Sequence, residues 1–232
     1  MGKIQEIYVR ETRDELGRYP NWPIQRPIQL GSVGIYDGRL AEFDWVTSLA
    51  TLGITVPPTR SQSLIDEMYT TLGAVNVKFE AATAGNKAGF NFAKAMAVAT
   101  QGYKTAYAFY ELGPLQQAIV SAIVGEKVEW NLDWVVVTEL WKSDAFTTLI
   151  SGAKGSSAEI STTQPVPSGV FNVADINVGV KLSRSDAMGY HGVAEKAVSP
   201  FFQIHRLIHD RKNNRYYLKR YGRNTFSFWP NK

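Results

Sequence analysis

Alternation between large and polar residues dominates the middle of the chain. It runs from Val75 to Ala81 and resumes from Ala88 to Thr100, after an interruption at Gly85-Asn86. A period of two residues is that of a β-strand with one face buried. The pattern therefore predicts a long β-hairpin. Its second strand is expected to carry Phe90, Phe92, Met96 and Val98 on one face.

Shorter patterns predict further strands on both sides of this hairpin. Ser32 to Tyr36 and Arg39 to Trp45 flank Asp37-Gly38, a dipeptide that favours the tight turn of a hairpin. The unbroken apolar run Trp134 to Val137 predicts a central strand covered on both faces. Other strands are expected at Ala145 to Ser151, Ala158 to Thr162 and Ile176 to Ser183, with a last hairpin formed by Phe201 to Ile208 and Tyr216 to Tyr221.

Three segments have the spacing of helices. Ile4 to Leu16 is followed by Gly17, which favours a helix end. Ser61 to Leu72 places its apolar residues on one helical face and has capping-box spacing near its start. Pro114 to Ile123 has an apolar stripe, and Gly125 follows it. We therefore expect a single α+β domain over residues 1–232, with a twisted, mostly antiparallel sheet, long hairpins and two or three short helices.

Charge is unevenly distributed along the chain. The whole sequence has 25 basic and 21 acidic residues, but the segment from Ser199 onward has eight basic residues and one acid, a charge of +7. The segment before it has a charge of −3. A basic, aromatic end of this kind suits lipid head groups, single-stranded nucleic acid or another subunit, and equally a solvated strand face. Its candidate contact residues are Arg211, Lys212, Arg215, Lys219, Arg220 and Trp229.

Signatures of catalysis are missing from the sequence. There is no cysteine, which removes thiolate chemistry, disulfides and cysteine metal sites. His205 and His209 have the spacing of a metalloprotease helix, but Arg206 stands where that motif needs Glu, and the surrounding pattern is that of a strand. The segment from Gly152 to Ser156 lacks the order of a phosphate-binding loop. We expect a protein that is not an enzyme and has no catalytic, cofactor or metal site.

Several short segments resemble the pore-forming domain of gasdermins, especially the bacterial and fungal members. They are Leu16-Gly17-Arg18-Tyr19, Pro23, Pro27-Ile28-Gln29-Leu30 and the run from Trp134 to Leu140 that leads into Ala145 to Ser151. The resemblance implies that the alternating segments of residues 75–100 are strands able to form a membrane hairpin. The chain lacks the N-terminal cysteine common in bacterial members, and only residues 222–232 follow its last predicted strand. Restraint of such a protein is then expected from this tail, from oligomer packing or from a regulatory protein.

Two function hypotheses follow. The first is a membrane-inserting effector that resembles a gasdermin pore-forming domain and acts in cell death or defence. It would bind anionic membranes, form a homo-oligomer and insert a β-hairpin after release by a protease or partner. It would be cytoplasmic and move to the membrane when active. The alternative is a non-enzymatic structural or assembly subunit of a larger protein particle, and nucleic-acid binding ranks below both.

Overall fold

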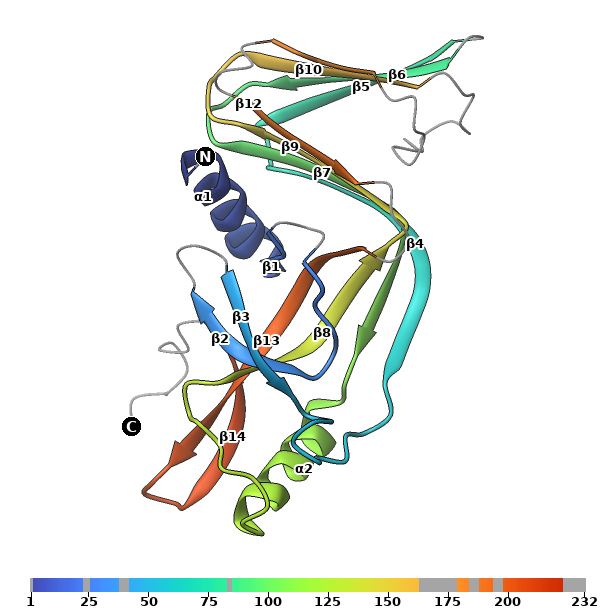
Figure 1. Cartoon of the computed structure of the whole chain (residues 1–232). Helices are drawn as coiled ribbons and strands as arrows, with labels where there is room; N and C mark the ends of the chain where they lie inside the picture. The colour runs from blue at the N-terminus through green and yellow to red at the C-terminus, as the bar shows by residue number, and fades with distance from the viewer. Residues whose placement is uncertain are drawn as a thin grey trace, which may run out of the picture. The chain divides into compact units, whose positions relative to one another are not determined.

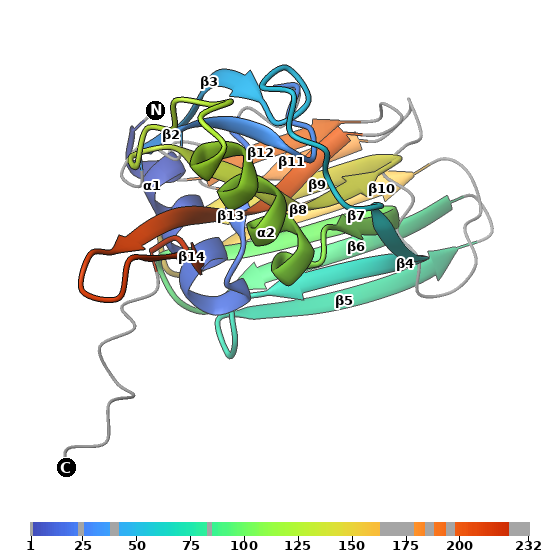
Figure 2. The same cartoon turned by 90° about the horizontal axis from the view of Figure 1, so that it is seen from below.

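The computed structural model describes residues 2–22, 26–37, 42–82, 85–162, 179–183, 188–193 and 198–222 (Figure 1; Figure 2 shows the view from below). Mostly antiparallel β-sheets account for 53% of the structure, and two α-helices accompany them. The predicted α+β class is confirmed. The chain divides into two compact units, each assembled from three separate stretches of sequence.

Unit 1 comprises Met1–Ile28, Ser61–Ala108 and Trp141–Phe202. Its elements are α1 (Gly2–Glu11), the π-helical turn η1 (Thr12–Leu16), β1 (Tyr19–Pro20), β5 (Val75–Ala82), β6 (Gly85–Phe92), β9 (Ala145–Ser151), β10 (Ser156–Thr162), β11 (Gly179–Leu182) and β12 (Met188–Val193). Most of β4 (Arg60–Thr70) and β7 (Ala97–Phe109), and parts of β8 (Val135–Ser143) and β13 (Val198–Asp210), also belong to it.

The strands of unit 1 form layers that follow from the two-residue period. A four-stranded sheet in the order β11-β10-β6-β5 packs through Phe90 and Phe92 against Ala97, Ala99 and Leu149 of β7 and β9. Helix α1 packs on the opposite face of β7 and β9, where Val98, Phe146 and Ile150 contact Ile7 and Tyr8 of the helix. Neighbouring residues of β7 thus enter different cores, as expected for a strand buried on both faces.

Unit 2 comprises Gln29–Arg60, Phe109–Leu140 and Gln203–Lys232. It contains β2 (Ser32–Asp37), β3 (Glu42–Ser48), α2 (Leu112–Val124), β14 (Arg215–Arg220) and the remaining parts of β8 and β13. Strand β2 pairs with β3 and β8, and β13 pairs with β14. Leu115 and Ile119 of α2 pack against Val33, Val136 and Leu207 of these strands. The apolar face of α2 therefore forms the core of unit 2 together with one face of the paired strands.

Most predicted elements are present. The helices near the N-terminus and after Leu112, the β13–β14 hairpin, and the buried run from Val135 to Val137 in β8 are confirmed. Strands β2 and β3 form the predicted hairpin, but the two-residue turn expected at Asp37-Gly38 is wrong, because Tyr36 pairs with Phe43 and Asp37 with Glu42. Gly17 has φ 63° and ends the π-helical turn, as the sequence indicated. The segments 163–178, which include the irregular region expected at Val166 to Ala174, and 223–232 lie outside the described residues.

The helix predicted over Ser61 to Leu72 is wrong, because the chain forms strand β4 there and pairs with β7. The apolar spacing that suggested a helix does not define a buried face. Met68 is 47% exposed and Leu72, beyond the strand, is 87% exposed. A neighbouring strand decided the conformation over local propensity, as is common for sheet-forming segments.

The second strand of the predicted long hairpin is shorter than expected. Strands β5 and β6 pair along their whole length, from Val75 opposite Phe92 to Ala82 opposite Gly85. The chain then bends at residues 93–96, where Met96 has φ 58°, a value that interrupts a strand. Strand β7 begins at Ala97 and belongs to the other sheet. The expected run from Ala88 to Thr100 is therefore two strands in two sheets.

Candidate functional site

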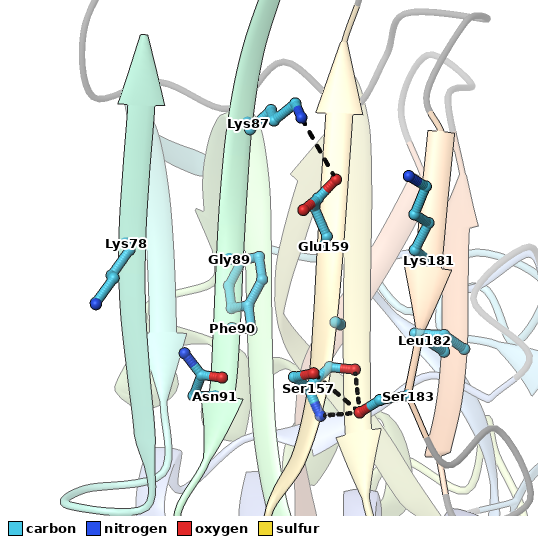
Figure 3. Close-up of a pocket in the computed structure, with 11 residues that line it drawn as sticks. Lys78, Lys87, Gly89, Phe90, Asn91, Ser157, Glu159, Lys181, Leu182 and Ser183 are labelled. Carbon is cyan, nitrogen blue, oxygen red and sulfur yellow. Dashed lines mark hydrogen bonds and ion pairs between the residues drawn. The ribbon is translucent and has the colours of Figure 1, made fainter.

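The outer face of the four-stranded sheet carries a shallow hollow of about 510 Å³ (Figure 3). Charged side chains rise from all four strands: Lys78 from β5, Lys87 from β6, Glu159 from β10 and Lys181 from β11. Gly89 lies at the floor, and a Cβ added there would meet no atom within 4 Å. The residues that line the hollow include three lysines and one glutamate, so the hollow has a net positive charge.

Few contacts hold the charged groups of this hollow. Lys87 Nζ lies 3.8 Å from Glu159 Oε1, and both side chains are about half exposed, so the pair contributes little to stability. The hydroxyls of Ser157 and Ser183 are 2.9 Å apart, and the Ser183 hydroxyl accepts from the Ser157 N–H at 2.7 Å. These serines tie β11 to β10 below the lysines (Figure 3).

The inner face of the same sheet is apolar and buried. Phe90 and Phe92 are its large side chains on β6, and Ile160 is its counterpart on β10. Ala158 is opposite Phe90 and Ala88 is opposite Ile160, so each large side chain of this face has a small cross-strand neighbour. This sheet therefore has one polar, charged face and one apolar face, each formed by alternate residues of the same strands.

Met96 and Val98 do not share that apolar face. Met96 lies in the bend, is 44% exposed, and its sulfur is 3.5 Å from Arg10 Nη2 of α1. Val98 is buried on the α1 side of β7, and its backbone N–H donates to Thr71 Oγ1 at 3.0 Å. Of the four apolar contact candidates, the structure brings together only Phe90 and Phe92.

Basic side chains gather on one face of the β13–β14 hairpin and on its turn. Arg206 is opposite Lys219 and Ile208 is opposite Tyr217, while Arg211 and Lys212 are exposed in the turn. Alternate residues of β14 are exposed: Arg215, Tyr217 and Lys219. We call Arg206, Arg211, Lys212, Arg215 and Lys219 the basic hairpin surface. Trp229 lies outside the described residues.

One carboxylate lies within this region, and it is used to close the turn. Asp210 Oδ1 accepts from the backbone N–H groups of Lys212 and Asn213 at 3.0 and 3.3 Å, and Oδ2 accepts from Asn213 Nδ2 at 2.7 Å. The bond from the Asn213 side chain is the main cause that lowers the pKa of Asp210. The carboxylate is therefore held as a turn cap beside the arginines.

Arg220 and His205 lie on the opposite face of the hairpin, and their side chains are not part of the basic hairpin surface. The amide oxygen of Gln203 accepts from Arg220 Nε and Nη2. His205 Nδ1 is 2.8 Å from the hydroxyl of Thr138 on β8. Burial, and secondly the charge of Arg220, lower the pKa of His205 from 6.5 to about 4. His205 is therefore neutral at physiological pH, and both residues hold the base of the hairpin.

Two features of the structure were not predicted from the sequence. Arg18 lies 4.3 Å from the ring centroid of Trp141, and its Nη1 is 2.7 Å from Glu67 Oε1, a cluster assembled from distant parts of unit 1. Trp45 on β3 is 62% exposed although it alternates with polar residues like a core position. Its cross-strand neighbour is Gly34, which has no side chain to cover it. The turn predicted at Asp37-Gly38 would have placed Leu30 opposite Trp45, so the predicted register did not bring Trp45 and Gly34 together.

Comparisons of the sequence give no relatives from which function could be transferred: no family model matches it, and no curated protein is significantly similar. Among the described residues, neither helix has the length and apolarity that a bilayer crossing requires. The features that bear on function are therefore the two-faced sheet of unit 1 and the charged surfaces of each unit.

Proposed function

We propose that this protein binds anionic membranes, oligomerises on them and inserts the β5–β6 hairpin as part of a β-lined pore. This function agrees with the resemblance to gasdermin pore-forming domains carried by Leu16 to Tyr19 and Trp134 to Leu140. The observation that supports it most is the separation of the four-stranded sheet into an apolar and a charged face.

A membrane-spanning β-strand needs an apolar face toward lipid and a polar face toward the lumen. Phe90 and Phe92 with the partly buried Val75 and Val77 supply the first, and Lys78, Lys87 and Asn91 supply the second. Each strand of the hairpin has eight residues, close to the roughly 9 to 11 that a span requires. Moving the apolar side chains from the core into lipid would preserve most of the about 1.5–3 kcal/mol that burial of each one contributes.

The position of Lys94 removes an obstacle to this proposal. In an unbroken strand from Ala88 to Val98, Lys94 would lie in the middle of the apolar face. Strand β6 ends at Phe92, and Lys94 is exposed in the bend that follows. An inserted β6 extended by two residues would carry Lys94 at its end, where a long side chain reaches the head-group region.

Initial attachment is assigned to the basic hairpin surface. Each lysine or arginine close to an anionic leaflet contributes about 1 kcal/mol. Among the described residues, no carboxylate lies within 4 Å of the charged groups of Arg206, Arg211 or Arg215. Tyr217, 38% exposed on the same strand face as Arg215, adds an aromatic ring suited to the interface.

Dye-filled anionic liposomes test the proposal directly. We expect leakage from intact or protease-nicked protein and none from neutral liposomes. The absence of leakage in both forms, together with no binding to anionic liposomes, would refute it.

Adjacent residues of β5 give a matched test of insertion. Because the chain has no cysteine, Val77→Cys and Lys78→Cys can each carry a single fluorophore. A nitroxide placed in the lipid tails should quench the label at position 77 and leave the label at position 78 bright. An aqueous quencher should give the opposite order. Equal quenching of both labels in leaking liposomes would mean that β5 does not line the pore.

A structural or assembly subunit remains the second candidate, and the exposure of Trp45 favours it. Such a subunit would form particles of defined size without membranes and cause no leakage. Light scattering of the protein alone, at the concentration used with liposomes, separates the two functions.

A further inference from the structure

The β2–β3 hairpin of unit 2 exposes apolar side chains that no described residue covers. Ile35 is 46% exposed, Val46 is 42% exposed, and Trp45 is the most exposed large aromatic residue among those described, at 62%. Among the described residues, β3 pairs only with β2, so it is an edge strand. Exposed edge strands with large apolar residues are characteristic contact sites for another chain.

Acidic residues accompany these apolar side chains. Asp37 and Glu42 are opposite each other at the end of the hairpin, and Asp44 is opposite Ile35. Among the described residues, Asp44 and Glu42 form no ion pair. The stretch from residue 32 to 48 contains three acids and one base, Arg39. A partner of this edge should therefore combine an apolar recess with positive charge.

Such a recess exists elsewhere in the same unit, between α2 and β14. The groove has a volume of about 670 Å³ and is open to solvent. Its apolar walls include Val120, Val124 and the rings of Tyr216 and Tyr217, and Arg215 stands at its border. Val124 is 69% exposed, so the groove has an uncovered apolar rim.

Two contacts preform the groove. Gln116 Oε1 of α2 accepts from the Leu218 N–H of β14 at 2.8 Å, which joins the helix to the strand at one end. The rings of His209 and Tyr216 stack with centroids 4.3 Å apart and an interplanar angle of 11°, which fixes one wall. A rigid recess of this kind receives an aromatic side chain with little ordering cost.

We propose that Trp45 and the acidic β2–β3 edge of one copy dock into the α2–β14 groove of a second copy. Trp45 enters between α2 and β14, and Asp44 and Glu42 face Arg215, Arg211 and Lys212. This interface rests on the proposed function, which requires self-association, and it specifies the two surfaces through which the copies would contact each other. The two contacting surfaces differ, so the contact is heterologous and each copy can bind one neighbour on either side. Repetition of such a contact closes a ring or extends a chain.

Single-cysteine variants of the full chain test this pairing. Val46→Cys and Val124→Cys, prepared separately with tags of different length, are mixed and oxidised with and without anionic liposomes. We expect the mixed disulfide to form at least about tenfold faster than either homodimer, because docking raises the effective concentration of the two thiols. Leu72→Cys on the exposed surface of unit 1 replaces either partner as the control.

Two further variants separate docking from random collision. Trp45→Ala should reduce the mixed disulfide to the level given by Leu72→Cys. Asp44→Lys should also reduce it, and Arg215→Glu in the partner copy should restore it. Both Trp45 and Asp44 are exposed, and circular dichroism checks that the variants remain folded.

Several results would overturn the interface. Dominant Val124→Cys homodimers would indicate a symmetric contact, and rates equal to the Leu72→Cys control would indicate no contact. Loss of liposome binding by Trp45→Ala with an unchanged mixed disulfide would assign Trp45 to the membrane instead. Mixed disulfides with neither binding to nor leakage from anionic liposomes would refute the pore function but support the interface. Leakage without mixed disulfides would support the pore function and refute the interface.

Discussion

The β5–β6 and β13–β14 hairpins have similar alternating sequences but differ in what covers them. The inner face of β6 is sealed by β7 and β9, so Phe92 is only 1% exposed. The β13–β14 hairpin buries Leu207 and half-buries Leu218 beside α2, and it leaves Arg215 and Tyr217 exposed. Action by the first hairpin requires it to leave a core, whereas the second can act from the surface.

Alternation alone therefore does not distinguish a hairpin whose apolar face is sealed in a core from one that presents side chains at the surface. Both patterns place apolar and charged residues on opposite faces. The deciding property is the packing partner of the apolar face, which comes from segments far away in the sequence. Substitutions on the inner face of the first hairpin should therefore change stability, and those on the basic hairpin surface of the second should change binding at constant stability.

The largest effect is expected from truncation of Phe92. Phe92→Ala should lower the free energy of unfolding by about 3–5 kcal/mol, since it leaves a cavity between two sheets. Urea denaturation measures this change. Asn91→Ala, the exposed neighbour on the opposite face, should stay within about 0.5 kcal/mol of the parent protein. A small effect at Phe92 would show that the β5–β6 hairpin is not clamped by its core.

Two matched triple variants, each lacking three positive charges, test which charged surface binds anionic liposomes. Arg211→Gln, Lys212→Gln and Arg215→Gln together should weaken binding to anionic liposomes about a hundredfold, from about 1 kcal/mol per charge. Cosedimentation at increasing salt measures the affinity. The matched triple variant Lys78→Gln, Lys87→Gln and Lys181→Gln removes the same charge from the four-stranded sheet. An equal loss of liposome affinity in both triple variants would mean that membrane binding depends on the total charge of the protein and not on the basic hairpin surface.

Acid should loosen the base of the β13–β14 hairpin selectively. Unfolded His205 protonates near pH 6.5, but burial and Arg220 delay its protonation in the folded state to about pH 4. The contribution of neutral His205 is therefore complete above pH 6.5 and is lost as the pH falls toward 4. The total loss is about 3 kcal/mol.

Hydrogen exchange between pH 7 and 4.5, corrected for intrinsic rates, locates this effect. Amides of β14 should lose protection before those of β6. In His205→Gln, the protection of β14 amides should no longer depend on pH more strongly than that of β6 amides. This holds even if the substitution itself changes the stability. Equal loss of protection in both hairpins, or an unchanged slope in His205→Gln, would contradict the assignment.

Local patterns predicted the elements whose signals lie within a few residues. The apolar stripe and Gly125 identified α2, and Asp37-Gly38 indicated the place of the β2–β3 hairpin but not its register. The segment Ser61 to Leu72 has helical spacing, but pairing with β7 made it a strand. No local signal placed the bend at Met96, where a non-glycine residue takes a positive φ. Information from a distant strand was needed in both cases.

The candidate site was predictable only in part for the same reason. The basic residues of the β13–β14 hairpin were visible as a charge excess, and the alternation of β14 placed Arg215 and Lys219 on one face. The same rule put Arg220 on the other face, where it meets Gln203 and His205. The groove between α2 and β14 brings together segments about a hundred residues apart, so no local pattern describes it.

The interleaving of the two units limits when the protein can fold during its synthesis. Unit 1 includes residues up to Phe202, and unit 2 begins at Gln29 but also needs the strands beyond Gln203. At 5–20 residues per second, a ribosome takes roughly 10–40 s to reach that point. Until then the nascent chain contains the apolar strands but neither complete unit. A message truncated before β13 would therefore yield a fragment in which neither unit can complete its core.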